Sequence, residues 1–443
     1  MHYSTPSAKA VVTSPSRRID MPYFTTAVPF NQTAIFWFGD VTPTDTYTDV
    51  RVGYNSSGLY IDLQVADQYL WYDTNTSAPN ISLYDNASIY LNTTSSASSL
   101  AAQQSYKFQA GVNGYKKRSN YQQAYTGSGT TWTAAKIPFT TVYGWRGHGF
   151  NGPADFGWSM TYLIPFASLG LSGPSTQGTV WKLAIQVHNR NDAANTPLPD
   201  KWWPDDAPSA VNPASWGDLQ FGLSSYQPPK TSSTKSYTIR NGLSSNPAVT
   251  DGMVGGSLSC GNQGLNRWTQ WGTRSYPAAA QINIQNESDL SDWNCYSKFY
   301  VTFPLSSLPT MGQSLVNAKV TLYEYGNSGP QGVVNPSYIQ VAVVNEDWNP
   351  ATLSWNTAPL VQENICSIQV NNKTKAGVLP PPGIPNTWDV SWAAAQAYSA
   401  GQPLRLVFYS TDNQHNAGKY FWSSYVGNWN TNGRPTLQVT LGS

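Results

Sequence analysis

The chain is poor in charged residues. Asp, Glu, Lys and Arg make up only 11% of its 443 residues, and the formal net charge at pH 7 is +1. An average globular protein carries about 25% charged residues. Nucleic-acid binding needs a cationic surface that displaces counterions from phosphates, so the composition excludes that class of partner. No apolar run reaches the length of about 18 residues that a bilayer requires, so we expect no membrane span.

Glutamate is absent from the first half of the chain, where no glutamate precedes Glu287. A glycoside hydrolase needs two carboxyl groups on either side of the scissile bond. The neighbouring Asp205 and Asp206 follow a proline, and a solvated turn explains them better than a catalytic pair. Neither an H-E-x-x-H helix nor a G-x-S-x-G elbow occurs. We leave open whether the chain is an enzyme and favour a non-catalytic role.

Cysteine is scarce as well. Cys260, Cys295 and Cys366 are the three cysteines, and no C-x-x-C pair supports a thiolate zinc site. One disulfide and one spare thiol is an option, and nearness in sequence alone favours a bond between Cys260 and Cys295.

Residues 1–16 carry no apolar signal-peptide core and are interpreted as a loose leader. The composition is nevertheless typical of secreted proteins, with few Lys and Glu and many Asn, Ser, Thr and aromatic residues. A trimmed export signal explains both facts. We predict a secreted protein, either extracellular or at the cell surface.

Short alternating runs dominate the chain. Leu59–Val65 and Trp181–Val187 place an apolar residue at every second position, as do several later segments. Alternation with one apolar face indicates half-buried strands. The segment Gln227–Ser236 has paired prolines and no large apolar side chain, which indicates a linker. We therefore predict an all-β protein with two β-sandwich domains of the jelly-roll or immunoglobulin-like kind, at residues 17–226 and 237–443.

The first half resembles the family 9-like carbohydrate-binding modules, which are β-sandwiches of secreted proteins. The resemblance rests on an ordered set of segments, Ile35–Gly39, Asp49–Tyr54, Gly58–Ile61, Asp85–Asn92, Ile164–Gly170 and Pro213–Gly217. It implies that sugars bind against aromatic side chains near the loops. Related modules often carry an acidic pair and a glutamate before the Ile-Tyr-Leu strand and use them for calcium or polar contacts. This chain has Tyr84, Asp85 and Ser88 there, so calcium is only an option.

The second half resembles the DNRLRE-type modules, which include the family 96 carbohydrate-binding modules. The matching segments are Lys298–Phe303, Asn317–Tyr323, Asp347–Trp348, Thr352–Pro359, Trp388–Val390 and Arg434–Val439. Some family 96 modules bind anionic polysaccharides through basic side chains. The candidates here are Arg240, Arg267, Arg274, Lys298, Arg405, Lys419 and Arg434. They are scattered in sequence, so we rank neutral glycans above anionic ones.

A pyranose ring offers an apolar C–H face and a rim of hydroxyls, which suit an aromatic face and planar polar side chains respectively. By position, the candidate binding residues are Trp71, Tyr72, Asn189, Arg190, Asp192, Trp202 and Trp203. Adjacent side chains in a strand point to opposite faces, so we expect one of Trp202 and Trp203 to face solvent.

Other tryptophans are assigned from their surroundings in sequence. We predict that Trp37, Trp158 and Trp181 lie in the core and that Trp348 and Trp355 serve the fold. Trp422 and Trp429 fall in a segment rich in Gly, Asn and Ser, and we predict that they are exposed.

The leading hypothesis is a secreted, non-catalytic protein that binds plant or microbial polysaccharide. One alternative is an extracellular structural or adhesive protein that self-assembles into filaments or a surface layer through strand edges. A second alternative is a polysaccharide-active enzyme or the accessory part of one.

Overall fold

The computed structural model describes residues 16–94, 98–102, 104–112, 117–147, 151–153, 155–204, 209–243, 248–255, 265–289, 292–309, 313–328, 334–371, 380–414 and 416–443. The predicted Asp205–Asp206 turn and Cys260 lie outside these residues, and only the backbone of Cys295 is described. The predicted all-β class is confirmed. Within the described ranges the single α-helix is α1 (Ser391–Ser399), which is too short to span a membrane.

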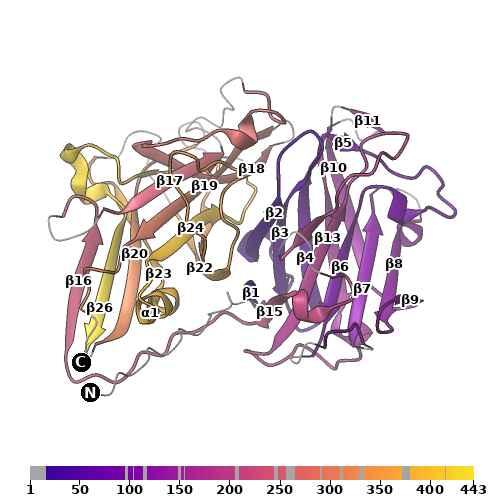
Figure 1. Ribbon diagram of the computed structural model, residues 1–443, viewed down its shortest axis with the longest axis horizontal. Coiled ribbons are helices and arrows are strands. Elements are labelled where there is room, and N and C mark those ends of the chain that lie inside the picture. Colours follow the sequence, from indigo (N-terminus) through magenta and orange to yellow (C-terminus); the bar gives the residue numbers. More distant parts are fainter. Residues whose placement is uncertain are drawn as a thin grey trace, which may run out of the picture.

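The first half of the chain forms two facing sheets (Figure 1). One sheet has the order β10-β12-β4-β3-β2 and consists of β2 (Ala34–Gly39), β3 (Tyr47–Tyr54), β4 (Gly58–Ala66), β10 (Thr140–Gly147) and β12 (Asp155–Pro165). The other consists of β1 (Arg18–Met21), β6 (Asn86–Asn92), β7 (Ser105–Gly111), β8 (Gln122–Gly127), β9 (Trp132–Ala135), β13 (Val180–His188), β14 (Lys201–Trp203) and β15 (Gly217–Phe221). A small pair, β5 (Tyr69–Leu70) and β11 (Gly152–Pro153), lies at one end.

The second half also forms two layers of strands. One layer contains β16 (Thr234–Arg240), β26 (Thr436–Gly442), β20 (Ser314–Asn327), β23 (Ile384–Asp389) and β25 (Lys419–Trp422). The other contains β17 (Thr250–Gly255), β19 (Asp292–Phe303), β24 (Leu404–Ser410), β21 (Ser337–Val343) and β22 (Glu363–Val370). Strand β18 (Gln281–Asp289) pairs with β25 through its first residues and with β19 through its last, so it connects the layers.

The alternation read from the sequence positions the core. In β13, Trp181, Leu183, Ile185 and Val187 are buried, and they face the opposite sheet. Trp37, Trp158 and Trp181 keep only 3%, 2% and 1% of their surface exposed, which confirms them as core residues. At about 25 cal/mol per Å² of apolar surface, such large side chains contribute strongly to stability.

Two carboxamide side chains join the halves by pairing with backbone groups across the contact. Gln340 accepts from the Ile35 amide (2.9 Å) and donates to the Ile35 carbonyl (2.7 Å). Asn364 makes the same pair of bonds to Asp20, at 2.8 and 2.9 Å. Each amide therefore substitutes for a missing strand neighbour and satisfies both backbone groups of its partner.

A buried lysine lies at the centre of this contact. Lys298 is only 2% exposed, and its Nζ lies 3.8 Å from the ring centroids of both Trp37 and Trp355. It donates to the Tyr47 hydroxyl at 2.5 Å, and that hydroxyl donates to Asp49 at 2.6 Å. Both halves thus supply rings to one cation.

Two opposing effects act on the pKa of the caged lysine, and burial is the larger of the two. Burial lowers the pKa of Lys298 well below the ordinary lysine value, and the Asp49 carboxylate opposes that shift. The faces of the surrounding rings also favour the ammonium form. Asp49 is held by Tyr409 Oη (2.9 Å) and Asn286 Nδ2 (3.1 Å), so neither charge is left without partners.

We predict that Lys298→Met lowers the free energy of unfolding by about 3–5 kcal/mol, because the buried Asp49 carboxylate loses its cation. Urea unfolding monitored by circular dichroism measures the change. The double variant Asp49→Asn/Lys298→Met should recover much of the loss. Lys319→Met, at an exposed position of β20, is the control and should change stability by less than about 0.5 kcal/mol. A Lys298→Met protein as stable as the wild type would contradict the role of the cage.

A second buried titratable group, the carboxyl group of Asp251, makes the stability of the fold depend on pH. Asp251 in β17 is 1% exposed and accepts from the Ser424 amide at 2.6 Å. Burial raises its pKa to about 7, against the opposing effect of the Ser424 hydrogen bonds. Because the unfolded value is about 3.9, this group stabilises the fold fully below about pH 4, and that stabilisation is lost as the pH rises through 7.

The expected result is that the unfolding free energy of the wild type falls relative to that of Asp251→Asn between pH 5 and pH 8. The change should be on the order of a few kcal/mol. Urea titrations of both proteins at the two pH values measure it. Asp347→Asn, whose side chain is 89% exposed, serves as the control. A difference that is the same at pH 5 and pH 8 would show that Asp251 is not protonated on folding.

Candidate functional site

Five of the predicted binding residues come from two loops at one end of β6 and β13. Asn86 and His188 are paired at the ends of these strands, so the segments just beyond them, Tyr84–Asp85 and Asn189–Asp192, are neighbours. Trp71 joins them because its amide donates to Asp85 Oδ2 at 2.6 Å. The structure thus brings Trp71, Tyr72, Asn189, Arg190 and Asp192 into one region.

Arg190 organises this region rather than facing outward. It is 8% exposed and donates to three carbonyl oxygens, those of Leu83 (3.1 Å), Asp192 (2.9 Å) and Ala193 (2.9 Å). Its guanidinium lies 4.2 Å from the Tyr84 ring centroid and 5.6 Å from that of Trp71. Its donors are therefore largely used inside the protein.

The other four loop residues differ in their surroundings, and Trp71 is half-buried. Asn189 is buried and donates to the Thr44 carbonyl at 3.3 Å. Asp192 accepts from the Thr196 amide, and hydrogen bonds from Thr196 lower the pKa of its carboxyl group. Half-buried Tyr72 is held by a hydrogen bond from its amide to Asn151.

The carboxylates near these loops do not fit a calcium ion. Asp85 is fully buried, and its two oxygens accept from the amides of Arg190 (2.7 Å) and Trp71 (2.6 Å). Burial and the nearby Asp67 raise the pKa of Asp85 well above the ordinary aspartate value. Calcium binds to carboxylate oxygens that are open to it, and both Asp85 oxygens are already bonded to amides. Across the described part of the chain, no three acidic, His or Cys side chains gather around one point.

Trp202 and Trp203 point to opposite faces of β14. Trp203 is completely buried and packs on Phe36 with 4.7 Å between ring centroids, so a sugar cannot reach it. Its assignment as a binding residue is therefore corrected to a core position. Trp202 is half-buried on the other face, where its ring lies 5.5 Å from that of Tyr90.

The face that carries Trp202 extends across six neighbouring strands, five of which are labelled on the right of Figure 1. We call it the outer face and define it by two cross-strand rows. One row comprises Ala184, Tyr90, Lys107, Tyr125 and Ala134. The other comprises Trp202, Gln186, Ser88, Gln109 and Gln123. Side chains that alternate with them belong to the main core, so these rows lie on the side away from it. Trp216 covers Tyr90 and Ala184 there in a small second cluster, so the open part of the face lies at its two ends, at Trp202 and Tyr125.

Contacts within the outer face hold its side chains in place. Lys107 Nζ lies 5.5 Å from the ring centroid of Tyr90 and 5.2 Å from that of Tyr125. Tyr90 donates to Gln186 at 2.7 Å, and Gln186 donates to Asp200. Burial lowers the pKa of Lys107, while Asp200 opposes this shift. The face therefore combines aromatic rings with fixed polar groups.

The outer face continues into a polar pocket of about 540 Å³. Gln109, Gln123 and Tyr125 line it from the sheet, and Asn80 and Asn120 line it from loops. None of the described residues that line this pocket is charged. Carboxamides donate and accept at once, as hydroxyls do, so this lining suits an uncharged ligand rich in hydroxyl groups.

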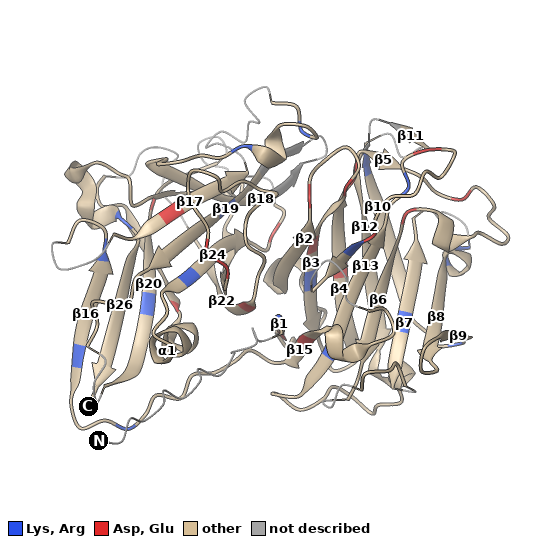
Figure 2. Cartoon of the chain, viewed as in Figure 1, with Lys and Arg blue, Asp and Glu red and all other residues tan. Residues whose placement is uncertain are grey.

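Among the described residues, the basic side chains of the second half do not gather into a cationic surface, and Figure 2 shows them scattered over the strands. Lys298, Lys419 and Arg434 are buried. Lys419 donates to Asn327 Oδ1 (2.9 Å) and the Asn335 carbonyl (2.7 Å). Arg405 forms an ion pair with Asp347. These charges serve the fold, which weakens the case for anionic-polysaccharide binding.

The predictions for the tryptophans of the second half are confirmed only in part. Trp355 is 3% exposed and Trp348 is half-buried, as expected for fold residues. The prediction that Trp422 is exposed is wrong, since it is 4% exposed and stacks on Tyr325 with 4.1 Å between centroids. Trp429 is 65% exposed, as predicted.

Comparison with known families supplies the class of the second half. Residues 268–424 match carbohydrate-binding module family 96. The resemblance of the second half to this family is thereby confirmed over that range. No curated protein matches the chain.

Solved structures similar to this chain cover its N-terminal half. A family 9 carbohydrate-binding module from Caldicellulosiruptor kristjanssonii in complex with cellotriose is 17% identical, covers 47% of this chain and 95% of its own, and has a TM-score of 0.35. The same organism's family 9 module with glucose is 18% identical, at 48% and 100% coverage and a TM-score of 0.33. A putative carbohydrate-binding protein from Bacteroides uniformis is 13% identical, at 46% and 99% coverage and a TM-score of 0.36.

Sequence reasoning missed Tyr90, Lys107 and Tyr125. Tyr90 and Lys107 each lie between two apolar or aromatic residues, and Tyr125 follows Ala124. That pattern could have assigned them to one face of their own strands. The pairing of β6, β7 and β8, which brings them into one row, is not visible in the alternation.

Proposed function

We propose that the protein is a secreted, non-catalytic polysaccharide-binding protein whose outer face holds a neutral glycan. The observation that carries this proposal is that the two cross-strand rows of the outer face, with their rings and amides, lead into the polar pocket. The family 96 match of residues 268–424 supports a carbohydrate ligand for the protein as a whole.

Physical dimensions support a chain rather than a single sugar. Trp202 lies on β14 and Tyr125 on β8, four strand steps apart through β13, β6 and β7. At about 4.8 Å per step this distance is roughly 19 Å. Half-buried rings at the two ends can stack on C–H faces of different units, while the half-buried Gln123, beside Tyr125 on β8, can bond a hydroxyl.

We expect weak binding, with dissociation constants of roughly tens to hundreds of micromolar, because shallow sites recover only a few kcal/mol above the cost of association. Binding should be found with neutral polysaccharides such as cellulose or xylan and be weaker with alginate. Pull-down on insoluble polysaccharides identifies the glycan that binds, and this in turn indicates whether the natural ligand is a plant or a microbial polysaccharide.

The test is isothermal titration of Trp202→Ala and Tyr125→Ala with the neutral oligosaccharide that binds best. Each variant should weaken binding about tenfold, the factor that corresponds to about 1.4 kcal/mol. Tyr23→Ala removes a ring that is 48% exposed outside the outer face and should leave affinity unchanged.

Unchanged affinity in the Trp202→Ala/Tyr125→Ala double variant would exclude the outer face as the binding site. Release of reducing ends from the bound polysaccharide would replace the non-catalytic reading with an enzymatic one. Filaments or sheets in negative-stain images, in the absence of glycan binding, would favour the self-assembling alternative.

A further inference from the structure

The second half carries an aromatic side chain that the fold leaves in solvent. Trp429 lies in the 3-10 segment Asn428–Gly433, which precedes β26. It is the only described tryptophan with more than a third of its surface exposed. Leaving an indole in water forgoes the stabilisation that its burial would give, so packing alone does not explain this position.

The exposed indole is nevertheless held firmly. Its ring stands edge-on to Trp422, with 5.4 Å between centroids and 89° between planes. It also covers the backbone of Gly427, where an added Cβ would lie 2.8 Å from Trp429 Cδ1. Trp422 in turn stacks on Tyr325 at 4.1 Å. Trp429 therefore loses little conformational freedom when a ligand lies against it.

An arginine clamp fixes the loop that presents Trp429. Arg434 is 7% exposed and donates through Nε and Nη2 to the Val426 carbonyl, at 3.1 and 2.7 Å. It also donates to Asn428 Oδ1 at 3.0 Å and to the Asn241 carbonyl at 3.1 Å. Its donors are occupied by the loop itself, so Arg434 shapes the loop and offers no free charge to a ligand.

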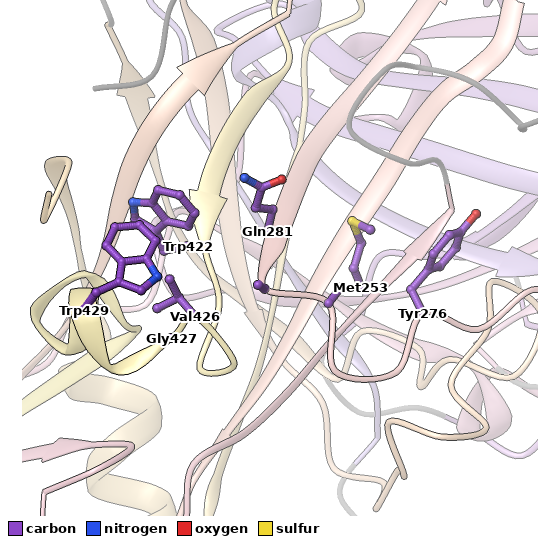
Figure 3. A pocket seen from close by; sticks show the side chains of 9 residues that line it. Met253, Tyr276, Gln281, Trp422, Val426, Gly427 and Trp429 are labelled. Atoms are coloured by element: carbon purple, nitrogen blue, oxygen red, sulfur yellow. The ribbon is translucent and has the colours of Figure 1, made fainter. Parts of the chain in front are cut away.

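Trp429 forms one wall of a pocket of about 400 Å³ (Figure 3). Trp422 and Val426 lie beside it, Gln281 stands in the middle, and Met253 and Tyr276 form the other wall. The lining that the described part of the chain supplies has no charged side chain. An indole face, a phenol ring and a single carboxamide are the groups that suit a sugar ring with uncharged substituents.

We infer that this pocket is a second carbohydrate subsite, which binds a neutral pyranose unit against Trp429. The inference shares with the proposed function the premise that the ligand is a glycan, and it goes beyond it by placing a separate site on the other half. Tyr276, Gln281 and Trp422 lie within the range that matches family 96, whereas Val426 and Trp429 lie just beyond it. Met253 lies before it, so the pocket combines residues inside the matched range with residues outside it.

Charge selects the class of sugar. An anionic glycan would need a cation in the pocket. Arg434, in the loop that carries Trp429, already has three acceptors. Arg274 acts on the pKa of Tyr276 from nearby but does not line the pocket.

The experiment uses the full chain with the outer face disabled by Trp202→Ala and Tyr125→Ala. Cellohexaose and xylohexaose are the neutral probes, and an oligomannuronate is the anionic probe. Residual binding of a neutral probe should be weakened at least tenfold by adding Trp429→Ala, as measured by titration calorimetry. Trp429→Phe keeps a ring and should retain part of the affinity.

Tyr425→Ala is the matched control, because Tyr425 is 40% exposed in the same loop but does not line the pocket. It should leave residual binding unchanged. Thermal unfolding of every variant should coincide with that of the parent, since the altered side chains are exposed or half-buried. The emission of Trp429 is obtained by subtracting the fluorescence spectrum of the Trp429→Ala form from that of the parent. This emission should shift to the blue when the probe binds.

Each result separates this subsite from the outer face. Residual neutral binding that survives Trp429→Ala would overturn the second subsite and leave the outer face intact. If Trp429→Ala weakens the residual binding of oligomannuronate more than that of the neutral probe, the assignment to neutral sugars is overturned. If the outer-face variant binds no probe while the wild type does, the subsite is excluded, and if the wild type binds none, both proposals fail.

Discussion

The structure depends on the enclosure of one ammonium group by rings from both halves of the chain. Lys298 comes from β19, and Trp37 and Tyr47 come from the first half. Removing a charge from water is costly, and here close ring faces and a hydrogen-bonded route to Asp49 offset the cost. Because neither half can satisfy this lysine alone, the two are held in one arrangement. The two proposed glycan sites, held in this arrangement, can engage one polysaccharide together, and this raises the effective concentration at the second site.

The scarcity of charge has a structural counterpart. Many of the charged side chains that the protein does have are used inside it, as Arg190 is on three carbonyls, Arg434 on the Val426 loop and Lys419 on two asparagine residues. The two pockets proposed as sites are lined by amides and rings instead. Such surfaces discriminate against ionic ligands, since they offer no compensation for a desolvated charge, and they accept hydroxyls at little cost.

The tryptophans show why residue type alone does not define a binding surface. Trp202 and Trp203 are neighbours in sequence, yet one packs in the core and the other lies half-buried on the outer face. Trp422 and Trp429 lie seven positions apart, and the first supports the second. A ring becomes available for a ligand only when another side chain or the backbone holds it while leaving one face free.

The sequence by itself determined the local structure: the strand alternation, the core positions of Trp37, Trp158 and Trp181, and the all-β class. These follow from hydrophobic periodicity, which depends on nearest neighbours along the chain. Only the tertiary structure decided which faces come together. The row Tyr90–Lys107–Tyr125 depends on strand register, and the Lys298 cage joins residues that are about 250 positions apart. Register and domain contact arise from packing between distant segments, and no single-strand pattern records them.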